Sequence, residues 1–265
     1  MFKFKNMALL GLAVLLCVLS GCVPAGLSYR TNPRFSEQAS LIRTVAVLPS
    51  EVKVFQIDVG NVREEIAEWS AQARTNVLAA LENELRTKLK AAVRFLDEES
   101  LTEEKDRLEE TRALYSAVSA MILIHTYPNP NFPSYLFEDK QKNFDYSLGR
   151  EVDSLAPGAD ALLLLDAEDH IWTAGRQALQ ALGVILGIGA AVGTGVVAIP
   201  QLGGGTSITA TLVDNDTGDI LWINTVGAGA GKDLRDPASA SEMVSQLFKD
   251  FPMSHDRQPK EEESR

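Results

Sequence analysis

The sequence predicts a mixed α/β domain in which amphipathic helices are layered on a mixed β-sheet. Two patterns indicate this α/β (α+β) class: short β-branched runs alternate along the chain with segments whose apolar residues recur every three or four positions. A third observation is that 265 residues with 45% hydrophobic content can build a core without metals or disulfides. We expect one folded domain over residues 41–251.

The N-terminus has the features of a secretory signal. Lys3 and Lys5 precede an apolar run over residues 7–19, which is shorter than the roughly 20 residues that a membrane-spanning helix needs. An uncleaved membrane anchor is therefore the weaker alternative. The run ends in Leu19-Ser20-Gly21-Cys22, which resembles the lipobox of bacterial lipoproteins. This resemblance implies that the signal 1–21 is removed and that Cys22 carries a covalent lipid.

Processing at this position changes the composition of the mature chain. Cys17 would leave with the signal, and loss of two lysines would leave 23 basic against 36 acidic residues, a net charge of -13. Such acidity argues against nucleic-acid binding. Val23 stands where an aspartate retains enterobacterial lipoproteins at the inner membrane, so the resemblance implies the periplasmic side of the outer membrane. Residues 22–40, with Pro24 and Pro33, are expected to form a tether.

The first half of the domain alternates strands and helices. Residues 44–48 are β-branched and stop at Pro49, which is typical of a buried strand. Apolar spacing predicts a long amphipathic helix over residues 64–92, followed by a strand at 93–96. A second helix is expected over 103–125, before a proline-rich break.

The second half predicts a short helix, a long strand, a hairpin and a last helix. Pro237 is suited to the first turn of that last helix. The expected order over the domain is β-α-β-α-α-β-β-β-α, before a disordered polar tail. The segments are 147–155 (helix), 161–172, 206–213 and 220–226 (strands), 214–219 (turn), 237–251 (helix) and 252–265 (tail).

Three segments together resemble the curli-secretion-channel (CsgG) and TolB N-terminal-domain-like envelope lipoproteins: Val45 to Pro49, Gly158 to Leu165 and Asp214 to Trp222. The hairpin motif, with Asp214, Thr217, Gly218 and Trp222, is the most specific of them. It predicts a tight turn at Thr217-Gly218 and a Trp222 that packs against a helix. The resemblance implies a non-enzymatic protein that oligomerises or assists export and envelope assembly.

One segment departs from that family. Residues 177–213 contain no charged side chain, and a glycine-rich apolar insert at 177–205 separates two expected strands. Small residues recur in it at four-residue spacing, as in helices that pack closely in lipid: Gly183, Gly187, Ala191 and Gly195. The insert is interpreted as a membrane-associated, self-associating helix, as a buried or subunit-interface helix, or as a glycine-rich loop.

Motifs for chemistry are weak. Gly187 to Gly193 imitates a dinucleotide fingerprint, but Pro200 interrupts the helix that should follow. The run from Gly227 to Lys232 lacks the first glycine of a phosphate loop and the Ser or Thr after the lysine, although its backbone amides could still bind an anion. We therefore expect no nucleotide cofactor.

Two clusters keep a functional alternative beside a structural one. The first could be a metal or acid–base site, or a solvated strand end: Asp166, Glu168, Asp169 and His170. The second could bind a partner, or could be a loop packed over the sheet: Tyr127, Phe132, Tyr135, Phe137, Phe144 and Tyr146.

Taken together, the sequence predicts a membrane-anchored periplasmic lipoprotein. We expect it to act as an oligomerising assembly or accessory component in export or envelope biogenesis, in contact with copies of itself and with other envelope proteins. The alternative is a periplasmic lipoprotein that binds an envelope glycan or lipid. We expect no enzymatic activity, no metal, and no cofactor besides the covalent lipid on Cys22.

Overall fold

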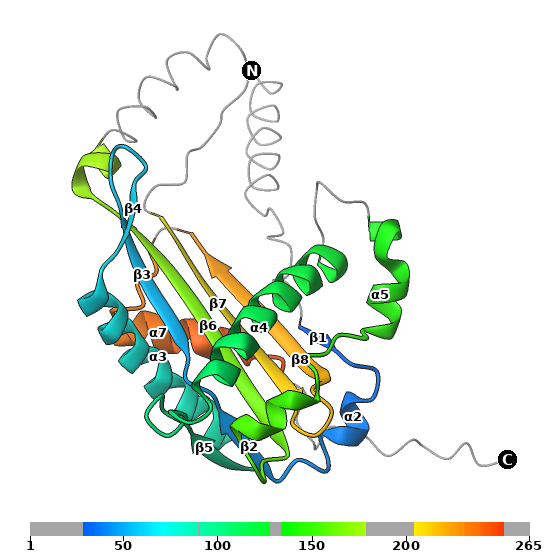
Figure 1. Ribbon diagram of the computed structural model, residues 1–265. Coiled ribbons are helices and arrows are strands. Elements are labelled where there is room, and N and C mark those ends of the chain that lie inside the picture. The colour runs from blue at the N-terminus through cyan, green and yellow to red at the C-terminus, as the bar shows by residue number, and fades with distance from the viewer. Residues whose placement is uncertain (1–28, 90, 128–133, 179–203, 230, 252–265) are drawn as a thin grey trace, which may run out of the picture.

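A computed structural model describes residues 29–89, 91–127, 134–178, 204–229 and 231–251. It confirms the predicted class, since helices pack on both faces of an eight-stranded mixed sheet (Figure 1). The main path of the sheet runs β1-β8-β7-β6-β2-β5, while β3 pairs with β6 and β4 pairs with β3. No helix among these described residues is both long and apolar enough to cross a bilayer.

The strands are β1 (Arg30–Thr31), β2 (Thr44–Val47), β3 (Glu51–Ile57), β4 (Arg63–Glu65), β5 (Ala92–Phe95), β6 (Ala161–Trp172), β7 (Gly205–Asp214) and β8 (Ile220–Ala228). The helices are α2 (Phe35–Gln38), α3 (Ala67–Lys88), α4 (Lys105–Thr126), α5 (Glu138–Asn143) and α7 (Pro237–Leu247), with the 3-10 helices η1 (Ser134–Phe137) and η2 (Arg150–Leu155).

Strand β6 organises the sheet. It is antiparallel to β7 along one edge and parallel to both β2 and β3 along the other. Val47 pairs with Leu163 but Glu51 pairs with Asp166, so the register shifts by one residue around Pro49. Because side chains alternate along a strand, this shift lets valines at odd positions of β2 and at even positions of β3 face the same core.

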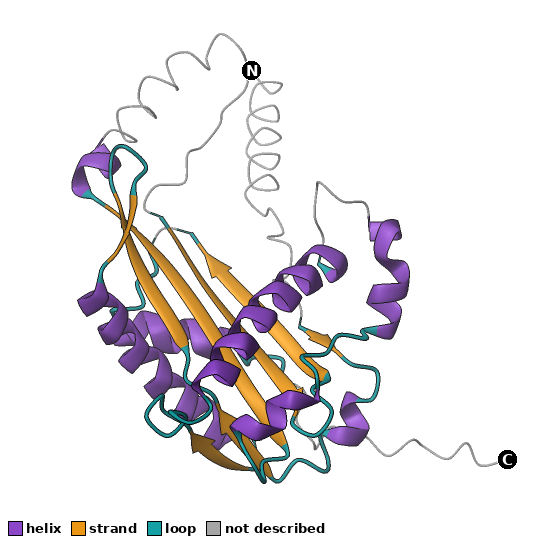
Figure 2. Ribbon diagram, viewed as in Figure 1, coloured by secondary structure: helices purple, strands orange, loops and turns teal. Residues whose placement is uncertain are grey.

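The sheet separates two hydrophobic cores. Helices α3 and α7 cover one face, here called the rear face, and α4 crosses the other, the front face (Figure 2). Residues of β6 alternate between them, with Leu163 and Leu165 in the rear core and Leu162 and Leu164 in the front core. Each core therefore takes every second residue of the same strand.

Several elements differ from those expected. No element was predicted over Glu51–Ile57, but this stretch is β3, and its alternation of apolar and polar residues is typical of a strand. Strand β4 takes the first residues of the expected helix, so α3 starts at Ala67 and ends at Lys88. The expected helix 147–155 is η2 alone, and that at 237–251 ends at Leu247.

The expected tether also differs. Strand β1 pairs with β8, and Phe35 of α2 is buried in the rear core, so the folded part begins near Tyr29 rather than at residue 41. The signal 1–21, Cys22, residues 179–203 of the glycine-rich insert and the tail 252–265 lie outside the described residues.

Candidate functional site

The β7–β8 turn is held by the side chain of Asp214. Its Oδ1 accepts hydrogen bonds from the backbone N–H of Asp216 at 3.1 Å and of Thr217 at 2.9 Å, and from the Thr217 hydroxyl at 3.0 Å. Gly218 follows in the left-handed region with φ of 74°. The predicted motif residues Asp214, Thr217 and Gly218 thus meet in one turn, by the local bonding that aspartate and threonine offer a backbone.

Gly218 is also required by a neighbour. A Cβ at this position would lie 2.0 Å from the carbonyl oxygen of Gly149, a distance that real side chains do not reach. The close approach lets Leu148 N–H donate to the Gly218 carbonyl at 2.8 Å. The glycine therefore joins the hairpin to the chain before η2, which the sequence motif alone did not predict.

Trp222 is fully buried on the rear face. Its ring stacks on Phe248 at 5.4 Å between centroids and meets Phe251 edge-on at 4.8 Å, at the end of α7. The tryptophan packs where a helix meets the sheet. Its place is a packing position in the rear core.

The expected acidic cluster around His170 is divided by strand alternation. Asp169 points to the rear core, whereas Asp166, Glu168 and His170 lie on the front face. Among the described residues, no group of three or more His, Cys, Asp or Glu side chains could hold a metal ion. Adjacent positions in the sequence are therefore on opposite sides of the sheet.

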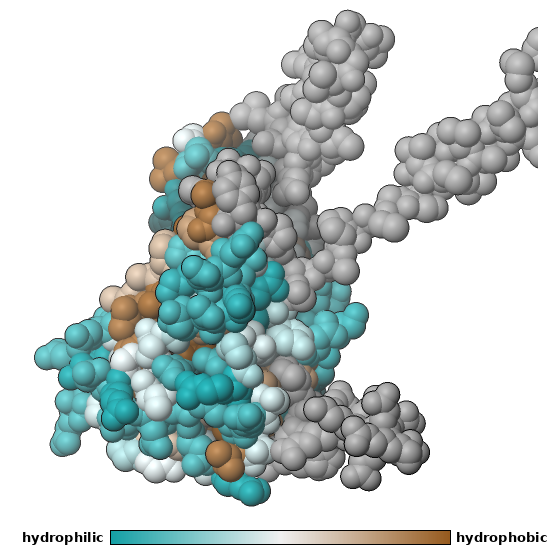
Figure 3. All heavy atoms as spheres, turned by 90° about the vertical axis from the view of Figure 1, so that its right-hand side faces the viewer, coloured by the Kyte–Doolittle hydropathy of each residue, from teal (hydrophilic) through white to brown (hydrophobic). Residues whose placement is uncertain are grey.

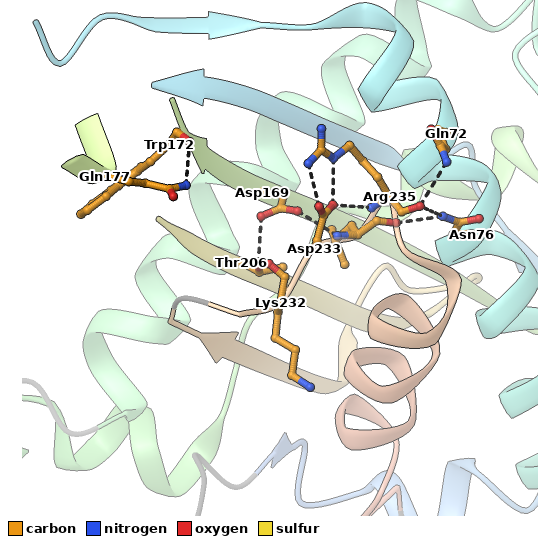
Figure 4. A network of polar contacts seen from close by, with 10 residues as sticks. Gln72, Asn76, Asp169, Trp172, Gln177, Thr206, Lys232, Asp233 and Arg235 are labelled. Carbon is orange, nitrogen blue, oxygen red and sulfur yellow. Dashed lines mark hydrogen bonds and ion pairs between the residues drawn. The ribbon is translucent and has the colours of Figure 1, made fainter. Parts of the chain in front are cut away.

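Asp169 bonds the loop before α7 to the sheet. Its carboxylate accepts from the Thr206 hydroxyl at 2.9 Å and from the Leu234 backbone N–H at 2.8 Å (Figure 4). Burial raises the pKa of Asp169, against the lowering effect of these two hydrogen bonds. Both oxygens are used within the fold, which makes Asp169 a structural residue.

The same loop is fixed to α3. Arg235 donates to Asp233 at 2.7 and 2.9 Å, and its guanidinium lies 4.2 Å from the centroid of the Trp69 ring. Gln72 and Asn76 donate their amide N–H groups to the Arg235 carbonyl (Figure 4). This network links the loop before α7 to α3 on the rear face.

Asp166 is the titratable group most altered by its surroundings on the front face. Burial, followed by the nearby Glu51 carboxylate, raises the pKa of Asp166 to about 7, although Lys53 and Arg112 act in the opposite direction. The Tyr115 ring of α4 is buried beside it and accepts a hydrogen bond from the Thr211 hydroxyl at 3.3 Å. Asp166 does not line the groove described below.

The upper half of the front face is polar. It is formed by Lys53 and Phe55 of β3, Glu168 and His170 of β6, Ser207 and Thr209 of β7, and Thr225 of β8. Helix α4 does not cover this half (Figure 1). Its side chains bond across strands: Arg63 pairs with Glu168 at 3.0 Å, and the hydroxyls of Thr209 and Thr225 are 2.9 Å apart.

The outer face of α4 exposes apolar side chains. No charged residue occurs from Ala113 to Ile124, over three turns of a helix that lies on the outside. Leu114 and Met121 are 41% and 43% exposed, and Ala117 and Ala120 between them are exposed too. Figure 3 shows hydrophobic atoms gathered toward its left side, the side on which α4 lies. We call Leu114, Ala117, Ala120 and Met121 the α4 patch.

Such a patch is uncommon on a helix in water. The solvent side of a surface helix normally carries charged residues, and the first half of α4 follows this rule with Lys105, Asp106, Glu109 and Glu110. Large contiguous exposed apolar patches are typical of contact surfaces. The sequence placed Leu114 and Met121 beside the buried side of the helix, but only the structure shows that they remain uncovered.

The aromatic cluster is mostly internal. Tyr127, Phe144 and Tyr146 are buried in the front core, and the His125 ring lies 4.4 Å from the Phe137 ring. The Tyr146 hydroxyl is 3.0 Å from His125 Nδ1. Phe132 and the side chain of Tyr135 lie outside the described residues. The described members favour the structural interpretation, a loop packed over the sheet.

A shallow groove of about 240 Å³ lies at the β5 edge of the sheet. It is lined by Glu82, Arg86, Leu89, Ala91, Val93 and Phe95. Its volume is below the roughly 300–1,000 Å³ of ligand pockets. The groove therefore gives little support to the alternative of a small-molecule binding protein.

No family model matches the sequence, and no curated protein matches it. Among solved structures, the chain is similar to the PelC dodecamer from Paraburkholderia phytofirmans, with a TM-score of 0.32 and 11% identity over 84% of this chain and 93% of that one. Lipoprotein GNA1162 from Neisseria meningitidis has a TM-score of 0.29 and 13% identity over 78% of this chain and 96% of that one. The LpoB C-terminal domain from Salmonella enterica has a TM-score of 0.22 and 10% identity over 73% of this chain and 94% of that one. TM-scores this low assign no functional residue to this chain.

Proposed function

We propose that this chain is a lipid-anchored protein of the bacterial envelope that works by assembling with copies of itself and with other envelope proteins, as an accessory component of export or envelope biogenesis. The α4 patch is the observation that carries the assembly part of this proposal. The Leu19-Ser20-Gly21-Cys22 sequence supports the anchor, and Val23 after it favours the periplasmic side of the outer membrane.

The α4 patch suits a second copy of the same helix. Leu114, Ala117, Met121 and Ile124 are spaced by three, four and three residues, a pattern that is symmetric about its centre. Two antiparallel copies would place the small Ala117 opposite the large Met121, and Leu114 opposite Ile124. Such a self-complementary surface is what a two-fold contact requires. Because the patch carries no charge, two copies of this acidic chain can meet there without bringing like charges together.

The residues that could do chemistry support a non-enzymatic role. Asp169 is bonded on the rear face, while Asp166 and His170 lie on the front face four residues apart along β6, roughly 13 Å. Catalysis by a pair of such groups needs both within hydrogen-bond reach of one reacting atom. We therefore propose binding, with no cofactor besides the lipid on Cys22, as the function of this chain.

Replacing both Leu114 and Met121 by glutamate tests the assembly. The lipidated protein extracted in detergent should elute as a discrete oligomer, and the double variant should elute as a smaller species of unchanged circular dichroism. Leu41→Glu is the matched control, since Leu41 is 69% exposed and lies outside the patch. A wild-type monomer, or an oligomer that the double variant leaves intact, would contradict the role of the α4 patch.

The glycine positions give a second, separable test of assembly. Gly187→Leu or Gly195→Leu should disperse the oligomer if the uncharged segment also contributes to it. If the glycine variants disperse the oligomer and the Leu114 and Met121 double variant does not, the contact between copies lies in the uncharged segment and not on α4.

The anchor is tested by labelling cells with radioactive palmitate. The wild-type chain should incorporate the label, and Cys22→Ala should lose it because the acylated sulfur is gone. Label retained by Cys22→Ala would show that the Leu19-Ser20-Gly21-Cys22 interpretation is wrong.

A further inference from the structure

We infer that one end of the sheet, and not the other, lies against the lipid surface. This end consists of the β3–β4 loop, residues 58–62, together with Trp172 at the end of β6 and Arg176 after it, and we call it the β3–β4 end. The inference rests on the lipid anchor at Cys22 proposed above. It adds the orientation of the folded domain, which the anchor alone leaves free.

The direction of the chain before β1 points to this end. Strand β1 is antiparallel to β8, with Arg30 opposite Ile223 and Thr31 opposite Trp222. Since β8 runs toward the β3–β4 end, β1 runs away from it, so Tyr29 lies on the β3–β4 side of Arg30. Continuing straight from β1, the lipidated residue would be carried toward the β3–β4 end.

The length of that chain fits the height of the sheet. Residue 29 lies beside Asn224, which is level with Leu165 of β6 through the β7 pairing. The seven residues from Leu165 to Trp172 rise roughly 23 Å along the strand. Residues 22–29 can extend at most about 24 Å. A fully extended anchor therefore brings Cys22 level with Trp172, and the β3–β4 loop extends beyond that level.

The β3–β4 loop presents apolar side chains in a fixed conformation. Val59 and Val62 are 55% and 61% exposed at its tip. The Asp58 carboxylate accepts from Val62 N–H at 2.9 Å, and Asp58 N–H donates to the Val62 carbonyl at 3.2 Å. Asn61 takes the left-handed conformation that the turn needs. Two valines held at the tip of a hairpin are suited to enter the headgroup region of a bilayer.

Cationic and aromatic groups lie just behind the tip. Arg176 donates to the Asp58 carbonyl at 3.0 Å and to the Asn61 side chain at 2.9 Å, and its guanidinium lies 4.7 Å from the Trp172 ring centroid. Both acceptors are neutral, and Arg176 makes no ion pair among the described residues. Its charge is therefore available to anionic headgroups, while tryptophan is favoured at the membrane interface.

The opposite end of the sheet has the reverse character. The β7–β8 turn presents Asp214, Asp216 and Asp219, and Asp160 precedes β6 beside it. Among the described residues, Asp219 is the only one of these four carboxylates in an ion pair, with Arg34 at 2.9 Å. An anionic membrane repels such a surface. Charge thus favours the same end as the chain direction does.

Bromolipid quenching at two engineered cysteines tests the orientation. The mature chain has no cysteine besides the acylated Cys22, so Val59→Cys or Leu41→Cys gives a single labelling site. Each lipidated full-length variant is labelled with a small fluorophore and bound to vesicles of phosphatidylethanolamine and brominated phosphatidylglycerol. Leu41 is the matched control because it is an exposed aliphatic residue just before β2, which starts at the opposite end.

We expect lipid bromines to quench the probe at residue 59 at least about threefold more than the probe at residue 41, since the bromines lie within the bilayer and apolar groups enter it by only 5–10 Å. Aqueous iodide should show the reverse order. Flotation of both variants with equal or reversed quenching would overturn the orientation and leave the anchor standing. If neither variant floats, the anchor itself is absent and the orientation falls with it.

Discussion

The rear face of the sheet is apolar along β6 from Ala161 to Ala167, whereas the front face becomes polar after Leu164. On the rear face even the one buried carboxylate, Asp169, is bonded to two donors. On the front face Glu168 and His170 remain partly exposed where α4 no longer covers the strands. The rear face is thus committed to stability, and the front face, with the α4 patch beside it, is the side free to meet other molecules.

Trp222→Ala should give the largest loss of unfolding free energy, because Trp222 lies in the tightly packed rear face. A small loss would contradict the contrast between the two faces. Removing a fully buried indole from between Phe248 and Phe251 leaves a cavity, which costs about 3–5 kcal/mol of unfolding free energy. Denaturant unfolding followed by circular dichroism measures it. Trp172→Ala, at the half-exposed end of β6, is the control and should cost much less. Equal losses would mean that the rear face is not the tighter core.

Asp166→Asn should stabilise the chain in a pH-dependent way. Because the folded-state pKa is raised to about 7 from 3.8, the folded chain holds this proton after the unfolded chain has released it, so stability falls as pH rises from about 4 to about 7. Because asparagine does not titrate, Asp166→Asn should raise the free energy of unfolding by about 2–4 kcal/mol above pH 7 and by almost nothing at pH 4.

The measurement is the difference in unfolding free energy between wild type and Asp166→Asn at several pH values, which cancels the other titrating groups. Glu168→Asn is a control on the same strand, since Glu168 is paired with Arg63 at the surface. A difference that does not change between pH 4 and pH 8 would show that Asp166 is not desolvated beneath α4.

The smallest expected losses of stability come from two threonines of β7 whose side chains point to opposite faces of the sheet. Thr206→Val removes a hydroxyl that donates to the buried Asp169, which should cost about 1–3 kcal/mol. Thr209→Val removes only a hydroxyl that bonds with Thr225 on the open half of the front face, which should cost about 0.2–1 kcal/mol of unfolding free energy. The same substitution thus reports on each face. A larger loss at Thr209 than at Thr206 would reverse the comparison.

Local sequence patterns predicted much of the fold because each depends on near neighbours. The strand 161–172, the hairpin 206–226 and the two long helices were found within a few residues, since periodicity and turn residues act over short distances. Strand β4 could not be found, because all three of its residues are exposed and only pairing with β3 makes them a strand. Strand β1 is likewise defined only by β8.

The candidate surfaces were harder to predict than the elements. The sequence put Asp166, Asp169 and His170 side by side, but the alternation of β6 sends Asp169 to the other core. It could not show that Leu114 and Met121 stay uncovered, because exposure depends on what packs against a helix from distant parts of the chain.

By itself the sequence determined the acidity of the chain, the Leu19-Ser20-Gly21-Cys22 motif, the uncharged run at 177–213 and the period of each long element, since these are properties of composition and of neighbouring residues. The tertiary structure decided which edge of β6 receives β2 and β3, which half of the front face α4 covers, and toward which end of the sheet the chain before β1 points. Those outcomes depend on contacts between residues far apart in the chain, whose energies no local pattern contains.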